Sequence, residues 1–245
     1  MFARLDRAPG TAILNLIFML THKDRTVENC LDVLDQALPL GVTHVGFKDI
    51  GVTQDVQAEI NRRIKAAGAR SYLEVVSETP EACLASARAA VELGVDCLLG
   101  GTDIDAIGAV IEQSVTGGSR IGYYPFVGFP TGHPTRLGGR PEDVAQHCRE
   151  YMRRGAAGVD LLAYRATDAD PVDLVRAARK ALPKGELIVA GSINGPDQVH
   201  LMAELGVDAI TIGTAILEGS FAPGTSGIVT QLEAALDAIA PLPHI

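Results

Sequence analysis

The fold is decided by two turns in the last quarter of the chain, in Val189-Ala190-Gly191-Ser192-Ile193-Asn194 and in Ala209-Ile210-Thr211-Ile212-Gly213-Thr214-Ala215. In each stretch a short apolar run ends in a turn that contains glycine, and the second turn opens a short helix. Glycine lets the backbone approach a ligand closely, and the amides at a helix N-terminus point outward as unsatisfied donors. Two such turns side by side predict a phosphate cradle, as found after the last two strands of an eight-stranded α/β barrel.

An internal repeat extends this pattern over the chain. Glycine followed by valine stands before four strand-like runs, at Gly41, Gly94, Gly158 and Gly206. Four more apolar runs lie between them, at residues 13–20, 71–77, 121–126 and 187–190. Helical periodicity marks residues 26–38, 79–93, 142–154, 171–182 and 196–205. Regular alternation of eight strands with helices predicts a (β/α)8 TIM barrel, formed by residues 1–245 as a single domain.

The composition agrees with this fold class and restricts the partners. Hydrophobic residues make up 47% of the 245 residues but aromatic residues only 4%, which suits parallel strands of Val, Ile and Leu under Ala-rich helices. The net charge of −9 argues against a nucleic-acid surface, because such a surface needs clustered Lys and Arg. An anionic substrate therefore requires a local positive site.

Cysteine and histidine spacing indicates a cytoplasmic protein without a bound metal. The four cysteines form no CxxC pair, which is typical of reduced thiols in the cytosol; they are Cys30, Cys83, Cys97 and Cys148. The histidines show no HxH or HExxH spacing. The apolar stretch at residues 12–20 is interrupted by Asn15 and is too short to span a bilayer. We expect no membrane partner, and a homo-oligomer is left open.

Strand alternation predicts which side chains enter the barrel. Because side chains on a strand point to opposite faces in turn, large apolar residues such as Phe47, Leu162 and Ile210 are expected to face the helices. The inward set is expected to be His44, Gly46 and Lys48; Cys97, Leu99 and Gly101; Leu161, Ala163 and Arg165; and Ala209, Thr211 and Gly213. The last member of each triplet lies at the C-terminal mouth, where barrel active sites are built.

Lys48 and Glu74 are the predicted catalytic pair. A lysine at a strand end inside a barrel is partly desolvated, which lowers its pKa and favours a role as nucleophile toward a carbonyl or as general base. Glu74 points inward by the same alternation, and an inward carboxylate is costly unless it is paired or used. Two other interpretations stay open: Lys48 binds phosphate, or the two residues form a structural ion pair.

Other polar residues are candidates for binding or for structural roles. Arg165 is expected to reach a phosphate or carboxylate of the substrate from the sixth strand, or else to pair with a loop acid such as Asp168 or Asp170. The long loop at residues 123–140 is expected to cover the mouth, and its His133 is a candidate for substrate binding.

Several aspartates are expected to be structural or weaker site candidates. Asp103 is expected to cap the helix that starts near Ile104, and Asp49 is a weaker candidate in a strand-following loop. The aspartates at the strand starts are expected to act in stability on the opposite face: Asp96, Asp160 and Asp208.

The last quarter, residues 187–217, resembles the ribulose-phosphate-binding barrels, a superfamily with sugar-phosphate isomerases, indole-glycerol-phosphate synthase and 3-keto-gulonate-6-phosphate decarboxylase. The resemblance implies that the substrate phosphate is held by Gly191, Ser192, Gly213 and Thr214. Flavin-dependent barrels share the motif and place the FMN phosphate there. FMN is therefore a minority alternative to the expectation of no cofactor.

Partial resemblances extend to the first half of the chain. Phe47-Lys48-Asp49-Ile50-Gly51 resembles the Asp-x-Lys-x-x-Asp strand of the decarboxylases, although Val45-Gly46 replaces its first acid. Leu73-Glu74-Val75-Val76-Ser77 resembles the short keto-acid phosphate aldolases, but the sixth strand here offers Tyr164-Arg165 and no lysine. Asn15 and Tyr123 stand where the histidine-pathway isomerases have aspartates, which implies substrate binding by these two residues.

These observations favour an enzyme that acts on a small phosphorylated sugar or keto compound. A lyase of the aldolase or decarboxylase kind is preferred, because lysine is the best-placed ionisable group. A sugar-phosphate isomerase or epimerase is the alternative. An FMN-dependent oxidoreductase and a barrel that binds a phosphorylated metabolite without turnover are two further classes.

Overall fold

Eight parallel strands form the central sheet of this computed structural model, which describes residues 14–76, 79–113 and 121–240. The strands are β1 Asn15–Met19, β4 His44–Lys48, β5 Arg70–Val75, β6 Cys97–Gly100, β7 Gly122–Tyr124, β10 Gly158–Leu161, β11 Glu186–Val189 and β12 Ala209–Ile212. They lie in the order β10-β11-β12-β1-β4-β5-β6-β7. A parallel bridge between Phe126 and Asp160 joins the two ends of this sheet. The chain is a (β/α)8 barrel, as predicted.

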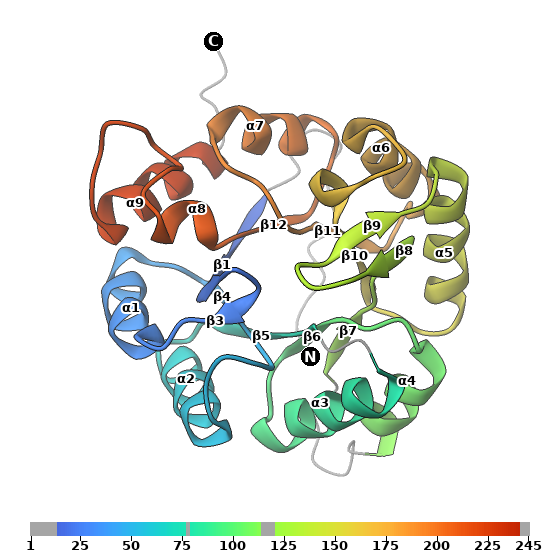
Figure 1. Cartoon of the computed structure of the whole chain (residues 1–245), viewed down its shortest axis with the longest axis horizontal. Coiled ribbons are helices and arrows are strands. Elements are labelled where there is room, and N and C mark those ends of the chain that lie inside the picture. Colours follow the sequence, from blue (N-terminus) through green and yellow to red (C-terminus); the bar gives the residue numbers. More distant parts are fainter. Residues whose placement is uncertain (1–13, 77–78, 114–120, 241–245) are drawn as a thin grey trace.

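Helices surround the strands on the outside (Figure 1). They are α1 Cys30–Ala37, α2 Gln54–Ala66, α3 Pro80–Leu93, α4 Ile104–Gln113, α5 Pro141–Arg153, α6 Pro171–Ala181, α7 Pro196–Glu204, α8 Thr214–Leu217 and α9 Ile228–Ile239. Two short 3-10 helices add η1 Leu38–Leu40 and η2 Ala163–Arg165. Proline at the first turn and a capping residue before it, such as Asp170 before α6, start several of these helices as the sequence indicates.

Two cores follow from the alternation of side chains along the strands. Phe47 and Ile210 belong to the outer core, which also contains buried helix residues such as Ile60 and Leu34. The inner core fills the barrel itself and contains Ile17, Met19, Tyr72, Cys97, Leu99, Tyr124, Ile188 and Ala209. All eight are buried and most of them are large, so the barrel is packed rather than hollow.

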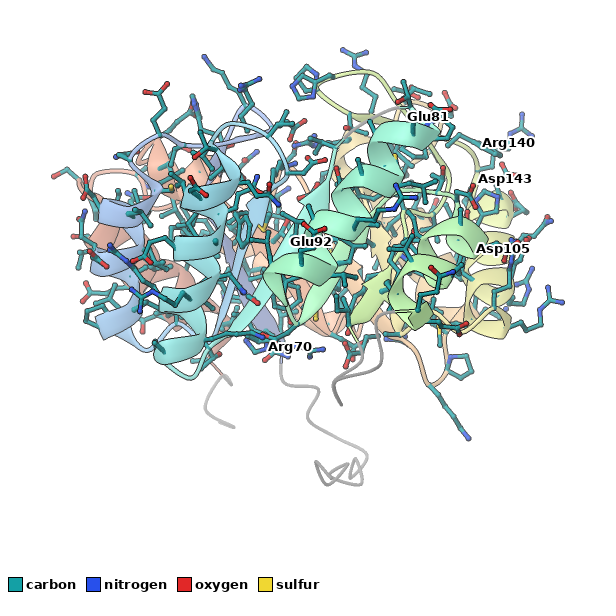
Figure 2. The ribbon with its side chains drawn as sticks, turned by 90° about the horizontal axis from the view of Figure 1, so that it is seen from below. Arg70, Glu81, Glu92, Asp105, Arg140 and Asp143 are labelled. Atoms are coloured by element: carbon teal, nitrogen blue, oxygen red, sulfur yellow. The ribbon has the colours of Figure 1, made fainter. Side chains whose placement is uncertain are left out.

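The two ends of the barrel differ in what they expose. Figure 2 shows Glu81 and Arg140, where α3 and α5 begin, at the upper edge of the molecule, and Arg70, where β5 begins, at the lower edge. The helix starts and the carboxyl ends of the strands therefore share the upper edge. Barrel active sites are built at this edge.

Two small hairpins modify the predicted element order. The predicted helix at residues 26–38 begins only at Cys30, because β2 Thr21–His22 and β3 Arg25–Thr26 pair antiparallel before it. The long loop after β7 contains a second antiparallel pair, β8 Phe129–Thr131 and β9 Arg136–Gly138. Ile13 and Ser77, which belong to predicted strands, lie outside the described residues.

The predicted facing of the sixth barrel strand was wrong. Gly41, Gly94 and Gly206 each adopt a positive φ at the turn before a strand, but in this quarter the equivalent turn residue is Gly155, with φ of 89°. Alignment on Gly158 instead of Gly155 moved the pattern by three residues and exchanged the two faces. Leu161 consequently lies in the outer core.

Candidate functional site

A cavity of about 540 Å³ opens at the carboxyl ends of the strands. It is bounded by the ends of β4, β5, β11 and β12, by the turn between β2 and β3, and by η2. Seven of the predicted site residues line it: Lys48, Glu74, Arg165, Gly191, Ser192, Gly213 and Thr214. The fold thus brings the predicted catalytic pair and the predicted phosphate turns into one space.

Lys48 is held by carboxylates on two sides. Its Nζ donates to Glu74 Oε1 at 2.9 Å and to Asp24 Oδ1 at 3.0 Å, and its side chain is only 5% exposed. Lys48 and Glu74 are direct neighbours in the register of β4 and β5, as expected. Burial by itself lowers the pKa of Lys48, but Glu74 and Asp24 raise it above its ordinary value. The prediction of a lowered lysine pKa was therefore wrong, and Lys48 is an ammonium ion.

Asp24 connects the two cations of the site, and the sequence analysis missed it. It occupies the second position of the two-residue turn between β2 and β3, with φ of 58°, after Lys23 with φ of 49°. Positive φ at both positions is the geometry of a type I′ hairpin turn, in which aspartate is tolerated better than most residues. The available signal was the pair Lys23-Asp24 between two short polar dipeptides, Thr21-His22 and Arg25-Thr26, which is weak on its own.

Arg165 reaches the site from η2 rather than from a strand. Its Nη1 and Nη2 donate to the two carboxylate oxygens of Asp24 at 2.6 and 2.8 Å, and Nη1 also donates to the Thr135 carbonyl at 3.3 Å. The partner is therefore Asp24 and neither Asp168 nor Asp170. The pKa of Asp24 is lowered well below its ordinary value, because these hydrogen bonds and the two cations outweigh the effect of burial. Three of the five N–H donors of an arginine are used within the described chain, which leaves two for a ligand.

The two glycine turns line the cavity, and both depend on close backbone packing. Gly191 has φ of 77°, and a Cβ at this position would lie 2.5 Å from Arg165 Nε, so the glycine makes room for the arginine. Ser192 follows with φ of 60°. At Gly213 a Cβ would lie 2.7 Å from the Met19 carbonyl oxygen, and Thr214 then opens α8. Close packing explains why both glycines are needed. The Gly191 amide donates to Thr211 Oγ1 at 3.4 Å, and Gly191, Ser192, Gly213 and Thr214 all line the cavity.

The cavity carries a local excess of positive charge. Lys23 and Arg136 line its rim and are exposed. Together with Lys48 and Arg165 they give four cations, against the carboxylates of Asp24 and Glu74 among the lining residues. In a chain whose net charge is −9, this difference marks the cavity as a place where an anion is stabilised.

Asn15, Tyr123 and His133 lie away from this cavity. Asn15 begins β1 at the opposite end of the barrel, where its side chain donates to the Asp208 carbonyl at 3.3 Å. Tyr123 packs in the outer core, and burial raises the pKa of its phenol. His133 is exposed in the turn between β8 and β9. The neighbour of Tyr123, Tyr124, is the one that points into the barrel.

Asp160 is the second residue whose role the sequence analysis misjudged. It was expected on the bottom face with Asp96 and Asp208, but its side chain lies inside the barrel with no exposed surface. Its register partner on β11 is Ile188, which belongs to the inner core. Leu162, two residues further along the chain, lines the cavity and Asp160 does not, so Asp160 lies beneath the cavity. Burial raises the pKa of Asp160 well above its ordinary value, and the Glu74 carboxylate raises it further.

Asp103 and Asp49 make contacts that hold neighbouring elements in place. Asp103 accepts a hydrogen bond from the Ala106 amide and caps α4, as expected. Asp49 accepts from the Val76 amide at 3.2 Å and from Ser86 Oγ at 2.7 Å, which ties β4 to β5 and α3.

Within residues 14–76, 79–113 and 121–240, no group of three or more His, Cys, Asp or Glu side chains is arranged to hold a metal ion. No helix in the same ranges is long and apolar enough to cross a membrane.

Comparison with known proteins shows the fold alone. No family model and no curated protein sequence matches the chain. The native KDPGal structure superposes with a TM-score of 0.63 at 13% identity over 97% of both chains. The tryptophan synthase alpha chain from Legionella pneumophila subsp. pneumophila gives 0.62 at 17% identity, over 95% of this chain and 94% of that one. Mandelate oxidase with 3,3-difluoro-2-hydroxy-3-phenylpropionic acid gives 0.61 at 16% identity, over 91% of this chain and 73% of that one. The chain is thus similar in architecture to several (β/α)8 barrels.

Proposed function

We propose that this chain is an enzyme that makes or breaks a bond beside the carbonyl group of a small phosphorylated sugar or keto compound. The observation that carries the proposal is the single cavity in which a buried Lys48–Glu74 pair faces two glycine turns and an excess of cations. A lyase of the aldolase or decarboxylase kind fits this arrangement best.

The substrate phosphate is assigned to the turns at Gly191-Ser192 and Gly213-Thr214. Backbone amides at glycine turns and at the start of a helix are ready-made phosphate ligands. The rim cations Lys23 and Arg136 add attraction for the anion. Arg165 packs against Gly191 and pairs with Asp24, which also accepts from Lys48, and it has two N–H groups left for a phosphate or carboxylate oxygen.

The ionisation of Lys48 decides between two kinds of lysine chemistry. A Schiff base requires a neutral amine, and the two carboxylates around Lys48 keep it protonated. An ammonium ion instead stabilises the negative charge that develops on the carbonyl oxygen as an enolate forms. Glu74 then accepts the proton from the substrate hydroxyl or carbon. Both aldol cleavage and decarboxylation pass through such an enolate.

A sugar-phosphate isomerase or epimerase is the second candidate. The observation in its favour is that Asp24 and Glu74 both contact Lys48, so two carboxylates flank the position of the enolate. A pair of carboxylates can remove a proton from one carbon and return it to another or to the opposite face.

Thermal-shift measurements test whether the cavity is an anion site. A ligand that binds only the folded state raises the melting temperature, so inorganic phosphate and a panel of triose, pentose and hexose phosphates should stabilise the protein. Arg136→Gln should weaken this stabilisation. Arg62→Gln, at an exposed arginine on α2 that lies far from the cavity lining, is the matched control and should leave it unchanged. Equal stabilisation of both variants would contradict the assignment.

Consumption of a stabilising compound then separates an enzyme from a binding protein. The compounds that give the largest shift are incubated with the protein and followed for loss of substrate and for new carbonyl products. A lyase yields two products or carbon dioxide, whereas an isomerase yields one product of the same mass. Binding without any conversion over the whole panel would overturn the enzyme proposal while leaving the anion site intact.

A further inference from the structure

The four ion-paired groups above Asp160 have a net charge of zero without any contribution from Asp160. Lys48 and Arg165 are cations, and Asp24 and Glu74 are their carboxylate partners, so these four groups sum to zero. An ionised Asp160 would add one uncompensated negative charge in the barrel interior. Such a charge is costly, and a buried acid usually remains neutral instead.

The contacts of Asp160 also indicate a neutral side chain. Within the described part of the chain, neither Oδ1 nor Oδ2 makes a hydrogen bond of good geometry, and the residue has no exposed surface. Its backbone is fully engaged, because its amide donates to the Pro125 carbonyl and its carbonyl accepts from the Val127 amide. The backbone is therefore held in place at this position, and the side chain has no exposed surface and does not line the cavity. A carboxylate without donors is far less stable there than a carboxylic acid.

We propose that Asp160 is a positioning residue that stays protonated beneath the cavity, and that its neutrality keeps a further negative charge away from the Lys48–Glu74 ion pair. Its place in turnover rests on the proposed function, but its charge state does not. If Asp160 ionises, a second negative charge appears near Glu74, which repels an anionic substrate. The affinity of the cavity for an anion then decreases as the pH rises.

The pKa of Asp160 supports this assignment. Burial raises it well above its ordinary value, and the Glu74 carboxylate raises it further, against the opposing effects of Lys48, Arg165 and the Leu161 amide. Because the folded-state pKa is raised, the folded protein holds this proton when the unfolded chain has lost it. The stability from Asp160 is full below the unfolded pKa of about 3.9 and is lost as the pH rises toward the folded pKa.

Urea unfolding as a function of pH tests the proposal without any substrate. Asp160→Asn keeps the shape and is always neutral, so it should become more stable than the wild type as the pH rises from about 4. The ratio of the two unfolding constants should grow by up to about tenfold for each pH unit until Asp160 ionises in the folded state. Asp208→Asn is the control, because Asp208 is also buried but pairs with Arg179 at 2.7 Å. It should be less stable than the wild type at neutral pH.

An ionised Asp160 would give the opposite result. Asp160→Asn would then be less stable than the wild type at neutral pH, as is expected of Asp208→Asn, and the proposal would fail. Infrared spectra provide a measurement that needs no variant. The folded wild type at neutral pH should show the C=O stretch of a protonated carboxylic acid, which shifts in D2O and disappears on unfolding. Absence of this band would overturn the proposal.

The pH dependence of anion binding tests whether the Asp160 proton affects the cavity. The affinity of the wild type for inorganic phosphate should decrease on the alkaline side by more than that of Asp160→Asn measured over the same range. Parallel profiles for the two proteins would remove the positioning role. If neither protein binds phosphate while the unfolding data show a protonated Asp160, the proposed function fails and the charge assignment stands.

Discussion

Replacing Asp24 by asparagine should destabilise the barrel more than any change at a surface ion pair. The carboxylate accepts two hydrogen bonds from Arg165, one from Lys48 and one from the Thr135 amide, and its side chain is 2% exposed. An asparagine carbonyl in the place of Oδ1 can still accept from Lys48 and from Arg165 Nη2, but it carries no charge, and its amide nitrogen in the place of Oδ2 would face the N–H groups of Arg165 Nη1 and Thr135. Lys48 keeps Glu74 as a carboxylate partner, so Arg165 is the cation left without one.

The structure sets the size of the effect. Removal of one partner from a buried ion pair costs about 3 to 5 kcal/mol, because the other charge remains buried and unpaired. The Arg165 side chain is 21% exposed, so water compensates part of this loss. We therefore expect a decrease of roughly 3 kcal/mol in the free energy of unfolding at pH 7, at the lower end of that range.

The dependence on pH identifies the cause. The folded-state pKa of Asp24 is lowered, so its stabilisation is present above the unfolded pKa and is lost as the pH falls through the folded value. The gap between wild type and Asp24→Asn should be full at neutral pH and should close progressively below about pH 4.

Urea unfolding followed by circular dichroism measures this gap, with a lower midpoint and an unchanged slope expected for the variant. Asp35→Asn is the matched control, since Asp35 pairs with Arg63 at 2.7 Å but is 59% exposed. It should have little effect, because exposed pairs contribute little. The reasoning is refuted if the two variants are equally stable, or if the Asp24→Asn gap is unchanged in acid.

Three further predictions concern single groups. Lys48→Met should abolish most of the turnover of any compound that the protein consumes. Borohydride should trap no adduct on Lys48 of the wild type, because its amine is protonated at rest. A covalent adduct found by mass spectrometry would restore the Schiff-base hypothesis. Gly191→Ala should displace Arg165 and weaken phosphate binding measured by calorimetry, because the added methyl lies 2.5 Å from Nε at a φ of 77°; unchanged affinity would exclude Arg165 from the anion site. Cys97 and Cys148 are buried, and burial raises the pKa of each thiol to about 12, so both should react with a thiol reagent only after unfolding; rapid labelling of the folded protein would contradict this.

Residues that the sequence placed correctly are those whose position depends on local pattern. Lys48 and Glu74 were paired by alternation along two adjacent strands, and Gly191 and Gly213 were recognised because a turn needs their conformation or their small size. The same pattern failed where a local cue was ambiguous. Two glycines three residues apart, Gly155 and Gly158, both fit the start of a strand, and the wrong choice moved Asp160 to the wrong face.

The sequence by itself determined the barrel, the edge that carries the cavity and the backbone turns that line it, because periodicity and glycine act over a few residues. Only the tertiary structure decided the charge of Lys48. Asp24 lies 24 residues away from Lys48 and 141 from Arg165 along the chain, and its contacts form only when the β2–β3 turn folds over the mouth. A pKa depends on burial and on charges within a few ångströms, so it is a property of the folded arrangement rather than of the residue type.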